Sequence, residues 1–264
     1  SYAFYGCSSL KQISIPSSVT TIEDITFGEC SSLEHVSLPS SITNICEYAF
    51  SDCSSLVDIM IPSSVTSIDS YAFYNCSSLS KITIPPSVTS FGECVFDECY
   101  EINEIKYDPS QTDLSSLLDD TSSITKIIFY PTVKTIENWN LSEFDYLNEI
   151  VIPSSVTTIN DYAFSDCCDL NKITIPSSVT VIKSYAFNNC SSLKDIKIPS
   201  SVTSIGEYAF NGCSSLTQIT IPSSVESIGN NAFDNCSSLN QITIPSTLKT
   251  RNFINNSSIK IIII

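Results

Sequence analysis

The stretch Ser201–Pro222, SVTSIGEYAFNGCSSLTQITIP, decides the fold because nearly the same sequence motif recurs along the whole chain. Prolines follow one another every 23 residues on both sides of this stretch. The regular series is Pro16, Pro39, Pro62 and Pro85, and then Pro153, Pro176, Pro199, Pro222 and Pro245. A cysteine stands nine residues before most of these prolines. A fixed period of this length indicates a repeat architecture in which each unit packs against its neighbours.

Each repeat has the form C-S-S-L-x-x-I-x-I-P-S-S-V-T-x-I-x-x-Y-A-F-x-x. The alternating I-x-I piece predicts a short strand, which ends at the proline because proline cannot donate in a ladder. V-T-x-I predicts a second β-prone piece, and Ala-Phe a tight turn or a single helical turn. A unit of this size cannot bury its own core. We therefore predict a repeat solenoid, mainly β, with a parallel ladder of I-x-I strands and about eleven or twelve coils.

The repeat pattern favours one domain over residues 1–264. We predict regular coils at 1–99, variant coils at 100–150, regular coils at 151–245 and a short terminal coil at 246–264. In the variant coils Ser122 and then Phe144 replace the repeated cysteine. Because Pro109, Pro131 and Pro153 keep nearly the same spacing as the other repeat prolines, a boundary between two domains at this place is the less favoured alternative.

Composition excludes several classes of function. The 264 residues carry a net charge of -16, so the chain is not expected to bind nucleic acid or an anionic membrane through its charge. A hydrophobic content of 42% suffices for a core. There is no apolar run of 18 residues. The chain opens inside a repeat without Met or a leader pattern, and we interpret it as a segment of something longer.

The pattern L-x-x-I-x-I-P-x-x-V-x-x-I-x-x-x-A-F-x-x-C resembles the BspA-type leucine-rich repeat, also called the Treponema pallidum type. The resemblance covers essentially the whole chain, and the Ile-, Asn- and Ser-rich wording is similar to the protist versions. It implies a leucine-rich-repeat fold, a place in a cell-surface protein and adhesion to host or matrix proteins. It implies no catalytic residue.

The cysteines allow two interpretations, a buried ladder of free thiols or disulfides. Equivalent cysteines stack in a solenoid and suit small buried apolar positions, which favours the thiol ladder. A spacing of 23 is not that of a zinc site. The off-register Cys46, Cys94 and Cys168, with Cys167 beside the last, are the candidates for oxidation.

No residue pattern predicts catalysis, a metal or a cofactor. His35 is the only histidine, and its outward strand position predicts a surface residue. The carboxylates of the middle segment have no EF-hand spacing, so a solvated acidic face is favoured over a calcium site. They are Asp97, Glu98, Glu101, Glu104, Asp108, Asp113, Asp119 and Asp120. Of six glycosylation sequons, at Asn75, Asn140, Asn189, Asn235, Asn255 and Asn256, only Asn140 lies outside the regular repeat template and the terminal coil, and it is the favoured acceptor.

The outward side chains of the strand ladder give the sharpest binding hypothesis. With the I-x-I isoleucines inward, two outward columns lie four and two residues before each proline. Most of their members are small or polar, but one cluster is apolar with a charged rim. The predicted binding residues are Ile127, Phe129 and Val151, rimmed by Lys106, Glu104 and Glu149. Such a cluster is typical of a protein-binding patch. The alternative is a shifted register in the variant coils, which would turn the apolar residues inward.

The last residues, SSIKIIII, match S-S-L-x-x-I-x-I in a shortened coil. This match predicts Ile259, Ile262 and Ile264 inward, and Ile261 and Ile263 outward on an open edge. An open edge can pair with another molecule.

The function that these patterns favour is non-catalytic protein binding through the strand-ladder face, as an adhesive part of a cell-surface protein. An intracellular scaffold is the rival hypothesis, because free thiols persist in a reducing compartment such as the cytoplasm.

Overall fold

The computed structural model describes residues 1–110, 117–118, 123–248, 252–255 and 259–264. The chain falls into two compact units, Ser1–Tyr130 (unit 1) and Pro131–Ile264 (unit 2). Their boundary lies inside the predicted variant coils. The expectation of one continuous solenoid over 1–264 stays a prediction.

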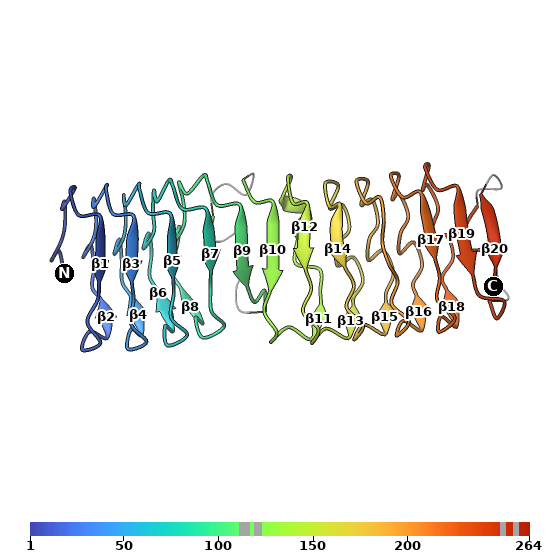
Figure 1. Ribbon diagram of the computed structural model, residues 1–264, viewed down its shortest axis with the longest axis horizontal. Helices are drawn as coiled ribbons and strands as arrows, with labels where there is room; N and C mark the ends of the chain where they lie inside the picture. The colour runs from blue at the N-terminus through green and yellow to red at the C-terminus, as the bar shows by residue number, and fades with distance from the viewer. Residues whose placement is uncertain (111–116, 119–122, 249–251, 256–258) are drawn as a thin grey trace. The chain divides into compact units, whose positions relative to one another are not determined.

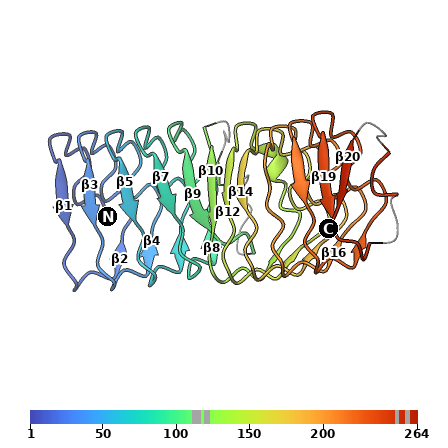
Figure 2. The same cartoon turned by 45° about the vertical axis from the view of Figure 1, so that its right-hand side comes forward.

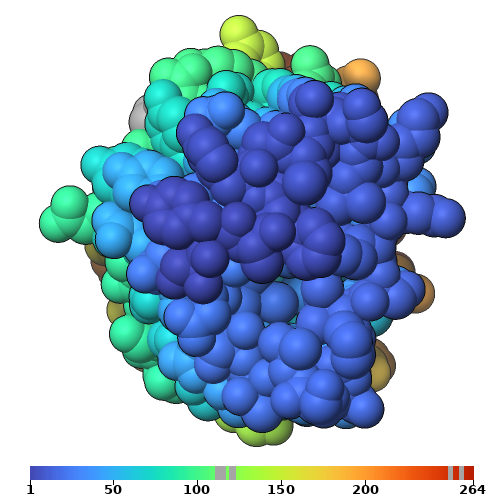
Figure 3. All heavy atoms as spheres, turned by 90° about the vertical axis from the view of Figure 1, so that its left-hand side faces the viewer, coloured from blue at the N-terminus to red at the C-terminus, as the bar shows by residue number. Residues whose placement is uncertain are grey.

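Unit 1 stacks its coils through two rows of parallel strands (Figure 1). The first row holds the I-x-I segments: β1 (Gln12–Ser14), β3 (His35–Ser37), β5 (Asp58–Met60), β7 (Lys81–Thr83), β9 (Glu104–Tyr107) and β10 (Lys126–Phe129). The second row holds the V-T-x-I segments: β2 (Thr21–Ile22), β4 (Asn44–Ile45), β6 (Ser67–Ile68) and β8 (Ser90–Phe91). Viewed from the N-terminal side, side chains of the first coils cover the end of unit 1 (Figure 3).

Unit 2 repeats this arrangement. Its first row contains β12 (Glu149–Val151), β14 (Lys172–Thr174), β17 (Gln218–Thr220), β19 (Gln241–Ile244) and β20 (Lys260–Ile263). Its second row contains β11 (Thr135–Ile136), β13 (Thr158–Ile159), β15 (Val181–Ile182), β16 (Ser204–Ile205) and β18 (Ser227–Ile228). A short 3-10 helix, η2, covers Leu141–Glu143. The predicted fold class, a parallel-strand solenoid with almost no helix, is confirmed.

The core consists of columns of identical side chains, one from each coil. In unit 2 the ring of Phe210 stacks between those of Phe187 and Phe233, at centroid distances of 5.0 and 5.4 Å. The Cys213 thiol lies in the neighbouring column and donates to the backbone oxygen of Phe187 at 3.2 Å. Sulfur suits this position because it fills a small apolar space and adds a weak second donor to a carbonyl that already accepts from the Cys190 amide at 3.3 Å.

Two left-handed backbone positions in each regular repeat shape the Ala-Phe turn. In the repeat that ends at Cys213 they are Tyr208, with a φ of 54°, and Gly212, with a φ of 73°. Most other repeats place Asn or Asp at the second position, which tolerates this conformation. The tyrosines at the first position gain stacking in return, as between Tyr185 and Tyr208 at 4.9 Å.

The terminal coil differs from its prediction. Strand β20 pairs with β19 so that Ile261 lies opposite Ile242 and Ile263 opposite Ile244. Because Ile242 and Ile244 are buried members of the inward column, the register puts Ile261 and Ile263 in the inward phase, contrary to the prediction, although Ile263 is still 52% exposed in this last coil. Ile259 is buried, as predicted, and Ile264 is exposed by 65% against the prediction. The physical reason is that the shortened coil offsets the register by one residue, and a run of four isoleucines fits either phase. Edge association through this strand stays a prediction.

Candidate functional site

The candidate site is the strand face, which we define as the outward side chains on and beside the first strand row of each unit. Figure 2 shows the strands that form this row. Inward and outward residues alternate along these strands, as in the exposed, buried, exposed pattern of Asp58, Ile59 and Met60. The strand face therefore presents two regular columns of side chains on a rigid support.

The structure corrects two of the predicted binding residues. Strand β10 places Ile127 opposite Ile105 and Phe129 opposite Tyr107, and the exposed fractions of Ile127 and Phe129 are 0% and 2%. Both are therefore core residues, and the alternative of a shifted register is right for this coil. The cause is one additional residue, Tyr130, between the strand and Pro131. In the regular coils the inward residues lie three residues and one residue before the proline. In this coil they lie four and two residues before it.

The other apolar member of the predicted patch, Val151, is exposed by 38% in unit 2. In unit 1 the outward position between Ile127 and Phe129 belongs to Ile128, which pairs with Lys106 of β9 and is half-buried. Sequence reasoning missed Ile128 because its coil was read in the regular phase.

The predicted charged rim is already engaged within each unit. Glu104 forms ion pairs with Lys81 at 3.8 Å and Lys126 at 3.1 Å. The ammonium group of Lys106 lies 4.5 Å from the ring centre of Tyr130.

In unit 2, Glu149 pairs with Lys172 at 2.6 Å. Ion pairs between partly exposed side chains are worth at most about 1 kcal/mol each, so a partner can displace them.

Sequence reasoning also passed over Met60, which is exposed by 80% in the outward column of β5. The signal in the sequence was a methionine in an outward column whose other members are mostly serine, threonine or lysine. Its flexible thioether suits adaptable protein contacts, and exposure of a large apolar side chain has no benefit for the free protein.

Charge is segregated within unit 1. All four of its lysines, Lys11, Lys81, Lys106 and Lys126, lie on or beside the first strand row. In the turn segments that follow β2, β4, β6 and β8, every charged residue is acidic. These residues are Glu23, Asp24, Glu29, Glu47, Asp52, Asp69, Glu93, Asp97 and Glu98. The strand face is therefore much less negative than the rest of this unit.

His35 is a surface residue, as predicted, with its Nδ1 3.3 Å from a carboxylate oxygen of Asp58. Among the described residues no group of three or more His, Cys, Asp or Glu side chains could hold a metal ion. Ser122 and the predicted acidic residues Asp113, Asp119 and Asp120 lie outside the described residues.

The repeated cysteines form the predicted ladder of free thiols. Those of the regular coils are buried apart from Cys7, and none is bonded to another. Burial raises the pKa of Cys167 and of Cys236 to about 12. Of the off-register candidates for oxidation, Cys46 and Cys94 are half-buried and Cys168 is exposed.

This burial predicts a sharp contrast in thiol reactivity at pH 8. We expect a maleimide to modify the exposed Cys7 and Cys168 within minutes, and Cys190, Cys213 and Cys236 only after unfolding, because the thiolate is the nucleophile. Peptide mass spectrometry with and without guanidinium chloride measures this. Stability should be complete below pH 9 and fall toward pH 12, since the unfolded thiols lose protons that the folded ones retain. Equal labelling of all cysteines in the folded chain would contradict the buried ladder.

The sequon asparagines differ in their surroundings. The side-chain amides of Asn75 and Asn189 each donate to an aspartate of the preceding coil at 2.8 Å, and Asn235 donates to Asn211 at 2.9 Å. These repeat-derived asparagines therefore have a structural role. Asn140 is exposed at the start of η2. Glycosylation of Asn140 stays a prediction, and Asn256 lies outside the described residues.

The model of the BspA type leucine rich repeat region matches residues 1–118, 114–240 and 157–264. The chain belongs to the BspA-type leucine-rich repeat family. The family resemblance predicted from the repeat words is thus confirmed, and the family suggests a protein-binding repeat of a typically non-catalytic kind. No curated protein sequence matches the chain.

Solved structures add similarities at low identity. A leucine-rich repeat protein from Bacteroides ovatus is 25% identical, with 100% of this chain and 86% of that chain covered and a TM-score of 0.45. A leucine rich cell surface protein from Faecalibacterium prausnitzii is 27% identical, with 96% and 79% covered and a TM-score of 0.35. TLR13, solved with a single-stranded RNA, is 13% identical over 96% of this chain and 42% of that chain, with a TM-score of 0.54. The last likeness is one of fold alone.

The described part of this BspA-type chain has no helix with the length and apolar character needed to cross a membrane.

Proposed function

We propose that this chain is a non-catalytic protein-binding segment that serves as an adhesive part of a cell-surface protein. The observation that carries the proposal is the strand face, which exposes Met60 by 80% on a rigid ladder. Rigid support lowers the entropic cost of binding, since the backbone is ordered before the partner arrives. The adhesive role rests on the family resemblance.

Electrostatics supports the same face. In unit 1 the four lysines stand against Glu34, Asp58, Glu104 and Asp108 on or beside the first strand row, whereas the charged residues in the turns after β2, β4, β6 and β8 are all acidic. A protein partner with acidic patches is repelled by the turns and meets a nearly neutral strand face, so the charge distribution favours one orientation of encounter.

A site-specific photo-crosslinker tests which face binds. We expect a crosslinking amino acid at Met60 to form covalent adducts with proteins of an extracellular-matrix preparation. The matched control places the same amino acid at Thr20, which is also exposed to solvent but lies outside the first strand row. Equal adducts at the two positions, or none at Met60, would refute binding through the strand face.

An intracellular scaffold is a second candidate, which the free thiols favour because disulfides are rare in reducing compartments. A free-thiol count and glycan analysis at Asn140 on native material separate the two locations. A glycan at Asn140 supports the cell surface, and full reduction without a glycan supports the scaffold.

A further inference from the structure

One coil of unit 2 lacks the strand that its sequence predicts. Residues 194–198, KDIKI, match the repeat words before Pro199, yet they form no strand between β14 and β17. Lys194, Asp195 and Lys197 supply three of the five residues, and both residue types are depleted in strands. The I-x-I ladder is therefore open on both sides of this coil.

Opening the ladder leaves backbone donors free. Within the described structure the amides of Asp195, Ile196, Lys197 and Ile198 donate to no backbone or side-chain acceptor. The nearest remaining ladder contact is a long one, from the Thr217 amide to the Lys194 carbonyl at 3.4 Å. Backbone amides that have no partner are strong donors, and a ligand with acceptor oxygens can satisfy them.

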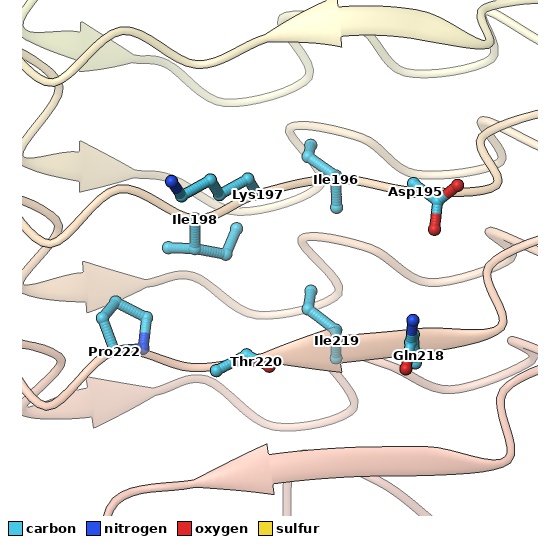
Figure 4. Close-up of a pocket in the computed structure, with 8 residues that line it drawn as sticks. All are labelled: Asp195, Ile196, Lys197, Ile198, Gln218, Ile219, Thr220 and Pro222. Carbon is cyan, nitrogen blue, oxygen red and sulfur yellow. The ribbon is translucent and has the colours of Figure 1, made fainter.

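A cleft of about 410 Å³ lies on the strand face at this place, between residues 195–198 and the following strand (Figure 4). This volume is in the range of sites that hold small molecules or peptide side chains. Figure 4 shows Lys197 near Pro222 at one end, and Asp195 beside Gln218 at the other. Ile196 and Ile198 line its floor and are buried.

Lys197 lines the cleft and Lys194 immediately precedes its first residue in the chain, and neither lysine has an ion-pair partner among the described residues. Lys194 and Lys197 are exposed, and neither is within 4.0 Å of a carboxylate oxygen among the described residues. The strand-face lysines of β7, β10 and β14 differ in this respect, because each is paired with a glutamate. Asp195 is the single acid of the cleft, and β17 and β19 bring none to the strand face. The carbonyls of residues 195–198 accept no backbone bond either, so the excess at this place is one of charge, with two lysines against one carboxylate.

We propose that this cleft binds an extended acidic segment of a partner protein, with carboxylates on Lys194 and Lys197 and oxygen atoms on the free amides. Charge complementarity is the argument for this partner, since the site offers donors and positive charge but only one carboxylate. The inference rests on the proposed protein-binding function and names the chemistry of the bound segment.

Fluorescence anisotropy with defined peptides tests the proposal on the full chain. The probe is a labelled eight-residue peptide of alternating Glu and Ser, and its comparison is the same peptide with Gln in place of Glu. We expect the acidic peptide to bind in a salt-sensitive manner and the Gln peptide to bind about tenfold more weakly or not at all. The double variant Lys194→Glu, Lys197→Glu should lower the affinity for the acidic peptide about tenfold.

The matched control is Lys134→Glu together with Lys183→Glu, which changes the charge of unit 2 by the same amount away from the first strand row. This control should alter the affinity less than about twofold. Circular dichroism and the thermal midpoint show whether each variant folds, and Lys194→Gln with Lys197→Gln replaces the charge-reversed pair if that pair does not.

Three results would overturn the inference: no binding of the acidic peptide, equal binding of the Gln peptide, or equal losses in the site and control variants. Binding of a sulfated oligosaccharide without binding of the peptide would also overturn it, because the anion would then be a glycan. If these tests fail while the crosslinker at Met60 still captures a protein, the proposed function stands and only this site is refuted.

Discussion

Replacing Phe129 by Asp is expected to destabilise unit 1 by more than about 5 kcal/mol, and thus to unfold it or bring it close to unfolding at 25 °C. The ring is 2% exposed and lies 6.1 Å from that of Tyr107, on the inward side of β10. Loss of a buried phenylalanine ring alone costs about 3–5 kcal/mol. A carboxylate at this place adds the cost of desolvation, since no lysine or arginine of the described residues is buried in the core. Urea unfolding followed by circular dichroism measures the change.

Ile128→Asp is the matched control in the same strand. Ile128 is outward, half-buried and paired in register with Lys106, so the new carboxylate meets solvent and a cation. We expect a change within about 1 kcal/mol. The opposite ranking, with a folded Phe129→Asp and an unfolded Ile128→Asp, would show that this coil keeps the regular phase and would restore Phe129 to the strand face.

The sequence predicts inward and outward residues correctly where apolar and polar residues alternate. Asp58-Ile59-Met60 in β5 is such a case, and its burial follows the repeat words. Both failures concern runs without alternation, Ile127-Ile128-Phe129 and the terminal isoleucines. A strand has a side-chain period of two, so a run of apolar residues carries no information on its phase. Only the pairing partner sets the phase, and β9 supplies it for β10.

The candidate site was predictable to a similar extent. The repeat words identify the outward columns, and therefore the ion pair of Glu104 with Lys126 across neighbouring coils could be anticipated once the register was known. The open ladder at residues 194–198 could not, because KDIKIP differs little from the KITIP of β14. Whether two strands approach closely enough to pair depends on the coils that support them, and local sequence contains little of that information.

Replacing Phe210 by Ala, inside the stretch that defines the repeat, is expected to lower the free energy of unfolding of unit 2 by about 3–5 kcal/mol. Phe210 is fully buried, and its ring stacks on both sides, on Phe187 at 5.0 Å and on Phe233 at 5.4 Å. The substitution leaves a cavity that the rigid coils on either side cannot fill. It also removes a contact from each neighbouring coil, and in a solenoid those contacts between neighbours supply the stability.

Phe4→Ala gives the comparison, since Phe4 is the same residue type in the equivalent column of unit 1. Its ring is 37% exposed and stacks on one side only, on Phe27 at 5.2 Å. We expect Phe4→Ala to cost about 1 kcal/mol, because less apolar area returns to water and solvent fills the space. Urea titration of both variants gives the ratio. Equal and small losses would mean that the phenylalanine column is not the element that joins one coil to the next, and that the two strand rows join them instead.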